Sequence, residues 1–129
     1  MRSFDRATSQ SIREGVLELI RWEQYGIDDS LPFGAMWYTV PPMSSSPKDE
    51  HFEGELSIVI SGRAFVEADG RVTEVAAGNA FLLDGDEPHI IHNRSDDTPL
   101  LIFSAYWDPA TAPSGKAMEA SAPSNAVGS

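Results

Sequence analysis

The sequence predicts a single all-β domain, a sandwich or barrel of short strands, from three observations. A chain of 129 residues suits one domain of ordinary size. Its hydrophobic content of 41% is that of a folded globular protein. Short β-branched and aromatic runs recur along the chain, and turn-forming residues separate them. Many short strands with turns between them are typical of sandwiches and barrels.

The expected strands can be placed in chain order. Residues 16–22 are ambiguous, because alternation favours a strand while the apolar residues also fit a helical stripe; we favour a strand because β-patterned segments follow. Gly34–Val40 is aromatic and β-branched, and the following Pro41-Pro42 pair ends it. Asp69-Gly70 is the strongest hairpin signal in the chain. The remaining expected strands are residues 55–60, 63–67, 71–75, 80–83, 89–93 and 100–107.

Composition divides the chain into three parts. Residues 1–14 are predicted to form an N-terminal arm, and residues 15–107 the β-barrel domain. Residues 108–129 are rich in Ala, Pro and Ser and have too little apolar surface to order themselves, so we expect a flexible tail.

Charge and cysteine content narrow the classes of function. A net charge of −11 disfavours nucleic acid and anionic membranes as partners. The chain has no cysteine, so disulfides and thiolate chemistry are excluded, and any metal must be held by nitrogen and oxygen ligands. No apolar run resembles a signal peptide or a membrane span, which makes the cytoplasm the expected location.

One short segment concentrates groups that bind metals. Asp49, His51, Glu53 and Glu55 alternate along the chain, so in an extended conformation their side chains point the same way. If that direction is inward, a divalent cation would neutralise the buried carboxylates, and His89 on a distant strand would complete the set. The alternative is that Asp49 and Glu53 lie on a solvated loop.

Two motifs resemble those of the cupin superfamily. In the row D-E-H-F-E-G-E-L-S-I-V-I-S-G, residues 49–62, His51, Glu55 and Gly62 match the first motif, and Asp49 stands where the family has its first His. In the row G-N-A-F-L-L-D-G-D-E-P-H-I-I-H-N, residues 78–93, Gly78, His89 and Asn93 match the second. Two aspartates, at positions 84 and 86, replace the usual Pro and Gly of its turn.

The resemblance implies a double-stranded β-helix, or jelly-roll barrel, that binds a divalent metal, Fe, Mn or Zn. The implied metal ligands are Asp49, His51, Glu55 and His89. Glu53 could replace Asp49 as a ligand or act as a general base, and Glu53 and Glu55 are the expected catalytic residues. The substrate pocket is expected to include the aromatic residues Tyr38 and Trp107. The resemblance also implies a homodimer.

Three kinds of function follow. The one we favour is a metal-dependent enzyme that acts on a small polar molecule, such as an isomerase, cyclase, lyase or dioxygenase, in a biosynthetic or catabolic pathway. The second is a non-catalytic binding protein with a degenerate metal site, which Asp49 in place of His favours. The third is an accessory subunit of a larger enzyme. The fold alone does not decide among them.

Overall fold

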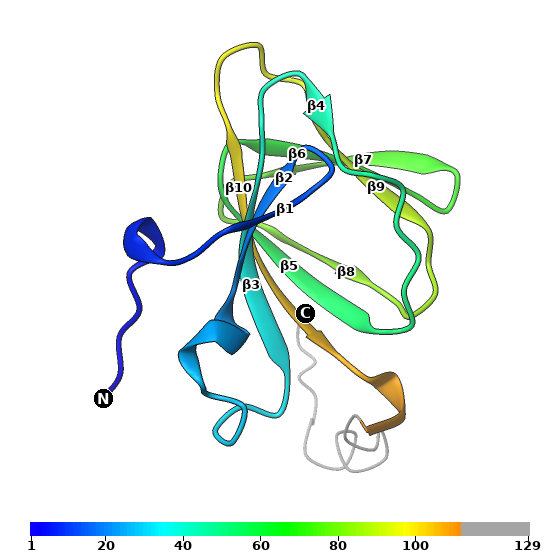
Figure 1. Cartoon of the computed structure of the whole chain (residues 1–129). Helices are drawn as coiled ribbons and strands as arrows, with labels where there is room; N and C mark the ends of the chain where they lie inside the picture. The colour runs from blue at the N-terminus through cyan, green and yellow to red at the C-terminus, as the bar shows by residue number, and fades with distance from the viewer. Residues whose placement is uncertain (112–129) are drawn as a thin grey trace.

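The computed structural model describes residues 1–111, which form two antiparallel β-sheets and contain no α-helix (Figure 1). One sheet has the strand order β1-β2-β3-β10-β5-β8 and the other β4-β9-β6-β7. The strands are β1 (Ile12–Glu14), β2 (Leu17–Arg21), β3 (Gly34–Val40), β4 (Ser44–Ser45), β5 (Gly54–Ser61), β6 (Arg63–Ala68), β7 (Arg71–Ala76), β8 (Ala80–Leu83), β9 (His89–Asn93) and β10 (Leu100–Trp107). Three short 3₁₀ turns are η1 (Arg6–Thr8), η2 (Trp22–Tyr25) and η3 (Pro109–Thr111). The predicted all-β jelly-roll class is confirmed.

The ambiguous segment is a strand. Leu17 and Leu19 are buried and Glu18 between them is exposed, which is the alternation of β2, and the helical alternative is wrong. The predicted hairpin turn joins β6 to β7, with φ of 52° at Asp69 and 72° at Gly70. Both values are left-handed, as a type I′ turn requires. β1 and β4 were not predicted, because each is only two or three residues long and has no buried alternation.

The hydrophobic core lies between the two sheets and draws on both. Its buried members are Leu17, Leu19, Tyr38, Val40, Val59, Ala64, Val66, Val75, Ile91, Leu100 and Ile102. On β5, the residues that share this inner side with Val59 are polar, namely Glu55 and Ser57. The interior therefore changes from apolar to polar along β5, toward its first residue.

The predicted tail, residues 108–129, lies outside the described residues from position 112 onward. Within residues 1–111, no helix is long and apolar enough to cross a membrane.

Candidate metal centre

A cavity of about 220 Å³ opens at the polar end of the interior. Its wall combines acidic, imidazole, aromatic and apolar side chains from both sheets. The lining residues are Glu14, Leu17, Leu19, Arg21, Met36, Tyr38, Ser46, Pro47, Asp49, His51, Glu53, Glu55, His89, Ile91 and Tyr106. A small pocket that is partly apolar and carries several convergent polar groups is typical of a binding site.

Backbone pairing brings the first motif to the second. The Asp49 amide donates to the His89 carbonyl at 3.0 Å, and the His89 amide donates back to the Asp49 carbonyl at 2.9 Å. This isolated antiparallel bridge fixes the loop before β5 against the first residue of β9. The two side chains therefore meet although 40 positions separate them along the chain.

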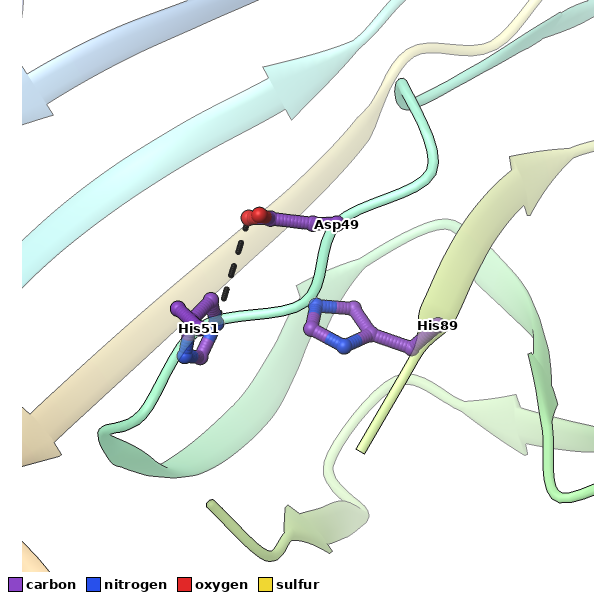
Figure 2. Close-up of side chains that lie close together, drawn as sticks. All are labelled: Asp49, His51 and His89. Atoms are coloured by element: carbon purple, nitrogen blue, oxygen red, sulfur yellow. Dashed lines mark ion pairs between the residues drawn. The ribbon is translucent and has the colours of Figure 1, made fainter. Parts of the chain in front are cut away.

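Three predicted ligands converge at this bridge (Figure 2). Asp49, His51 and His89 each offer one ligand atom, and these atoms all lie within 4.8 Å of one another. The two imidazole rings are 5.2 Å apart between centroids and are inclined at 77°. His89 is buried, and the side chains of His51 and Asp49 are 23% and 48% exposed. The group is therefore closed on the His89 side and open to the cavity mouth at Asp49.

The two glutamates of the segment flank His51. Glu55 is buried at the start of β5, and its Oε1 lies 3.2 Å from His51 Nε2. It contacts the cluster through His51 and is not part of the three-residue group. Glu53 Oε1 lies 3.7 Å from His51 Nδ1, and a third of its side chain is exposed. Both carboxylates line the cavity, so the segment points inward as a unit.

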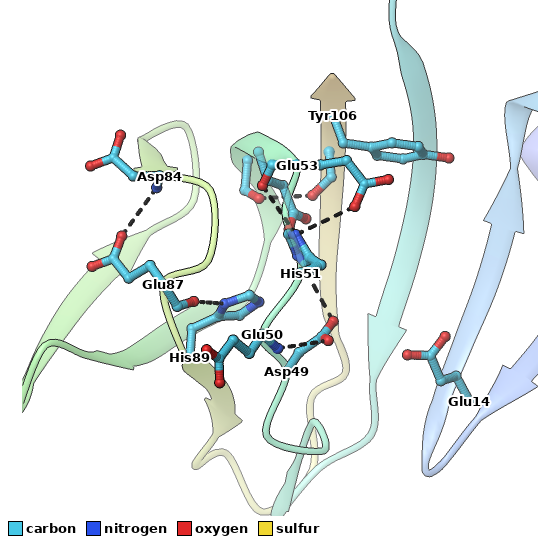
Figure 3. Close-up of polar contacts among 12 residues, drawn as sticks. Glu14, Asp49, Glu50, His51, Glu53, Asp84, Glu87, His89 and Tyr106 are labelled. Atoms are coloured by element: carbon cyan, nitrogen blue, oxygen red, sulfur yellow. Dashed lines mark hydrogen bonds and ion pairs between the residues drawn. The ribbon is translucent and has the colours of Figure 1, made fainter. Parts of the chain in front are cut away.

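Backbone carbonyls fix the tautomers of both histidines (Figure 3). His51 Nδ1 lies 3.1 Å from the Glu53 carbonyl, and His89 Nδ1 lies 2.9 Å from the Glu87 carbonyl. A carbonyl oxygen can only accept, so Nδ1 of each ring carries the proton and donates it. When such a ring is neutral, its lone pair is on Nε2, the nitrogen that can then bind a metal.

The contact between His51 and Glu55 suits a bound cation. In the neutral ring, the lone pair of His51 Nε2 faces a carboxylate oxygen of Glu55 at 3.2 Å. Two electron-rich atoms at this distance repel unless a proton or a cation lies between them. The non-histidine charges around the cavity are four carboxylates, from Glu14, Asp49, Glu53 and Glu55, and one guanidinium, from Arg21. Imidazole and carboxylate donors of this kind suit Fe, Mn or Zn.

The turn before β9 supports the cluster from behind. The Asp86 amide donates to the His51 carbonyl at 2.6 Å. Asp86 has a φ of 65°, so it adopts the left-handed conformation at the position where the cupin motif has Gly. At Gly85, an added Cβ would lie 2.3 Å from the Phe52 carbonyl oxygen, so only glycine allows this close approach.

The two predicted pocket aromatics are placed differently. Tyr38 lines the cavity, and burial raises the pKa of its hydroxyl well above the ordinary value; the Glu55 charge raises it further, while hydrogen bonds with Ser104 and Ser57 lower it. Trp107 does not line the cavity. It packs over Gly54, where an added Cβ would come within 2.9 Å of the indole, and borders a separate depression. Its neighbour on β10, Tyr106, lines the cavity instead, because successive side chains of a strand face opposite sides.

Sequence reasoning missed Arg21 and Tyr106. Arg21 Nη1 donates to the Tyr106 hydroxyl at 3.1 Å, and this hydroxyl donates to Glu23 Oε2 at 2.8 Å. Tyr106 lies two residues after Ser104 on β10, so the two side chains share one side of the strand, and Ser104 is buried on the inner side. A polar residue at this spacing is the signal that could have indicated Tyr106. No motif indicates Arg21.

The other residues of the second motif have structural roles. His92 points away from the cavity, as its spacing from His89 predicts, and contacts Glu67 Oε1 at 2.9 Å. Asn93 donates to the carbonyls of Val40 and Thr98, and its Oδ1 accepts from the Ser95 amide. It therefore supports the turn after β9.

The fold and this imidazole–carboxylate cluster define the class of protein, a small β-barrel with a polar site inside it. The family model described as "Cupin domain" matches residues 36–106, and the chain belongs to the cupin family. Solved structures agree. The plu4264 protein from Photorhabdus luminescens is 26% identical, with 85% of this chain and 88% of that chain covered and a TM-score of 0.70.

Two further structures are similar over most of their length. A Cupin 2 conserved barrel domain protein from Salinispora arenicola is 28% identical, with 85% and 89% of the two chains covered and a TM-score of 0.68. The polyketide cyclase RemF from Streptomyces resistomycificus is 19% identical, with 82% and 78% covered and a TM-score of 0.68. At that identity, the likeness to RemF shows the fold alone.

Proposed function

We propose that this cupin binds a divalent metal ion and acts as an enzyme on a small molecule held in the cavity. Asp49, His51 and His89 are the proposed ligands, with Glu55 as a fourth. The observation that carries the proposal is that Asp49, His51 and His89 each bring a ligand atom within 4.8 Å of the others, while backbone carbonyls lie at Nδ1 of both imidazoles. Such fixed tautomers are what a metal site needs, and a bound cation would relieve the contact between His51 and Glu55.

The roles of the side chains follow from their positions. A bound divalent ion would supply a Lewis acid that polarises a substrate carbonyl or holds two substrate oxygens. Glu53 lines the cavity beside His51 and is not needed as a ligand, so we assign it the transfer of a proton. Glu55 could share this role if it does not bind the metal. Tyr38 stays protonated at neutral pH because burial raises its pKa, so its hydroxyl can donate to a substrate oxygen.

The proposed reaction is one that needs a polarised carbonyl or enol and one mobile proton, such as those of isomerases, cyclases and lyases. If the metal is iron, dioxygenase-like chemistry also suits a site of this kind. RemF is a polyketide cyclase with the same fold, so a barrel of this shape can accommodate a cyclase. The second candidate is a binding protein without turnover. The feature that favours it is Asp49, which changes the donor set of the first motif.

The test is elemental analysis of untagged protein purified without chelator. Wild-type protein should carry Fe, Mn or Zn near one equivalent, and the His51→Ala/His89→Ala variant should carry none. His92→Ala is the matched control, because it removes the third histidine, which lies outside the cavity. Wild type without metal, and without stabilisation on adding any of the three, would exclude the metal enzyme and favour the binding protein.

We also propose that the partner of the chain is a second copy of itself, through the outer face of β5 and β8. The exposed row of β5 is Leu56, Ile58 and Ile60, and Leu82 pairs with Leu56 across the strands. This strip carries no charge in a chain of net charge −11, so two copies meet there with the least repulsion. β8 is also the edge strand of its sheet.

Light scattering tests the dimer. Leu82→Glu should shift the mass to that of a monomer, because it places a carboxylate in the strip of both copies. Val72→Glu is the control, since Val72 is equally an exposed apolar residue but lies on β7 of the other sheet. A monomeric wild type, or equal loss of dimer in both variants, would contradict this surface.

A further inference from the structure

Apart from its two histidines, the cavity wall has one basic side chain. Arg21, the last residue of β2, contributes its guanidinium to a wall that also carries four carboxylates and two imidazoles. In the sheet, β3 and β10 separate β2 from β5, so Arg21 stands across the sheet from the strand that carries Glu55. The cavity therefore has the histidine–carboxylate cluster on one side and Arg21, with Glu14 near it, on the other.

Tyr106 holds the guanidinium at this wall. Its hydroxyl accepts from Arg21 Nη1 at 3.1 Å and donates to Glu23 at 2.8 Å. Burial and the Glu23 hydrogen bond raise the pKa of Tyr106 to about 12, so the hydroxyl keeps its proton at neutral pH and makes both bonds. Figure 3 shows the Tyr106 ring directed away from His51. Arg21 is thus positioned by a contact that does not involve the metal ligands.

Most donors of Arg21 remain available to a ligand. A guanidinium presents several N–H donors in a planar fork. Among residues 1–111, the bond to Tyr106 is the one hydrogen bond that this side chain makes. Its Nη2 lies 4.0 Å from Glu14 Oε1, and the two side chains are 40% and 50% exposed. An ion pair this long and this exposed is weak, so a better-placed anion can displace Glu14.

We infer that Arg21 binds a carboxylate, or a similar planar oxyanion, of the substrate. The inference rests on the proposed function and narrows its substrate class. The fork of a guanidinium matches the two oxygens of a carboxylate, which makes the contact specific as well as strong. Apolar side chains complete the wall, from Leu17, Leu19, Met36 and Ile91. The ligand is therefore a small carboxylate with an apolar body, and its remaining polar group faces the histidine cluster.

A matched pair of probes tests this inference without knowledge of the substrate. Cyclohexanecarboxylate and cyclohexylmethanol share a skeleton and differ in charge. Their dissociation constants are measured by ligand-observed NMR on the metal-loaded full chain. Arg21→Gln should weaken carboxylate binding roughly tenfold or more, the size of a lost charged hydrogen bond, and leave the alcohol unchanged. Metal content should not change.

Arg63→Gln is the matched control. Arg63 also lies on a strand and pairs with a glutamate, Glu74, but it is on the other sheet and does not line the cavity. This variant should bind both probes as the wild type does. Arg21→Lys keeps the positive charge but not the planar pair of donors. Its affinity for the carboxylate probe should lie between those of the wild type and Arg21→Gln.

Several results would overturn the inference. One is equal carboxylate affinity in Arg21→Gln and wild type, and another is a wild type that binds the carboxylate no better than the alcohol. If His89→Ala weakens the carboxylate while Arg21→Gln does not, the anion binds at the metal. Failure of the proposed function would give a different result. The protein would hold no metal, but it would still bind the carboxylate more tightly than the alcohol, and Arg21→Gln would still remove this difference.

Discussion

The two sides of the cavity are held by different means. On the cluster side, backbone hydrogen bonds between Asp49 and His89 set the register, and backbone carbonyls orient both imidazoles. On the Arg21 side, a side chain of β2 meets Tyr106, 85 positions later in the chain, through one side-chain hydrogen bond. A position set by the backbone can change its side chain without moving. A position set by side chains is lost when either of them changes.

This difference explains how Asp49 can stand where the cupin motif has a histidine. The bridge to His89 uses only the main-chain groups of Asp49, so the residue remains beside the cluster whatever its side chain. The substitution changes the charge and reach of one donor and leaves the frame of the site intact. By the same reasoning, a side-chain change at Asp49 should affect metal affinity, whereas a change that disturbs the backbone should also affect the frame of the cluster.

The largest expected effect is on metal affinity at Asp49. Asp49→Asn removes a charged donor and should weaken metal binding roughly 10–100-fold or more, because changing even a residue that only supports the ligands has an effect of that size. Asp49→His restores a strong donor at the same backbone position and should lose less. Competition with a chelator of known affinity measures both. Equal affinity in Asp49→Asn and wild type would show that Asp49 is not a ligand.

The next largest effects are expected for two glycine substitutions, one on the cluster side of the cavity and one on the Arg21 side. Gly85→Ala forces a Cβ against the Phe52 carbonyl and should cost about 1–3 kcal/mol of stability and weaken metal binding. Gly34→Ala meets the Tyr106 ring and Glu23 instead, so it should spare the metal and impair the Arg21 side. Urea unfolding and metal titration of both variants measure the contrast. Equal effects of the two on metal binding would contradict the separation of the sides.

A smaller effect on stability is expected for Glu55→Gln, with one sign in the metal-free protein and the opposite sign in the metal-bound protein. Without metal, Glu55→Gln replaces a buried carboxylate, 3.2 Å from His51 Nε2, with a neutral amide that can donate to this nitrogen, and should raise stability by about 1 kcal/mol. With metal, the same change should reduce the stabilisation that the ion provides. Thermal unfolding with and without metal tests both signs. A loss of stability in the metal-free protein would show that Glu55 is already compensated.

The smallest effect concerns Tyr106 and alkaline pH. Its folded-state pKa of about 12 lies above the ordinary value of 10.0, so folding favours the protonated hydroxyl. The resulting stability is complete below pH 10 and is lost as the pH rises toward 12. Tyr106→Phe should lower the free energy of unfolding by about 1 kcal/mol or less at neutral pH. Between pH 9 and 11, the variant should lose less stability than the wild type. Parallel pH profiles for the two proteins in urea unfolding would contradict this.

The residues that the sequence predicted and those that it missed differ in one physical respect. Asp49, His51 and Glu55 lie in one segment, so alternation alone places them on one side, and the cupin motifs add His89. Trp107 was predicted for the pocket and Tyr106 was not, because alternation shows that they face opposite ways without showing which way is inward. Hydrophobicity does not decide it on β10, since Phe103 on the outer side is covered by Trp22.

The sequence by itself determined the all-β class, the strands that carry the core, the Asp69-Gly70 turn and the shared side of residues 49–55. These are local properties, fixed by the conformational preferences of neighbouring residues. Only the tertiary structure decided which side is the interior. On β5 the more apolar row, Leu56 to Ile60, faces outward, and the row that starts with Glu55 faces the cavity. The meeting of Asp49 with His89, and of Arg21 with Tyr106, likewise depends on pairings between distant strands, which no short stretch of sequence specifies.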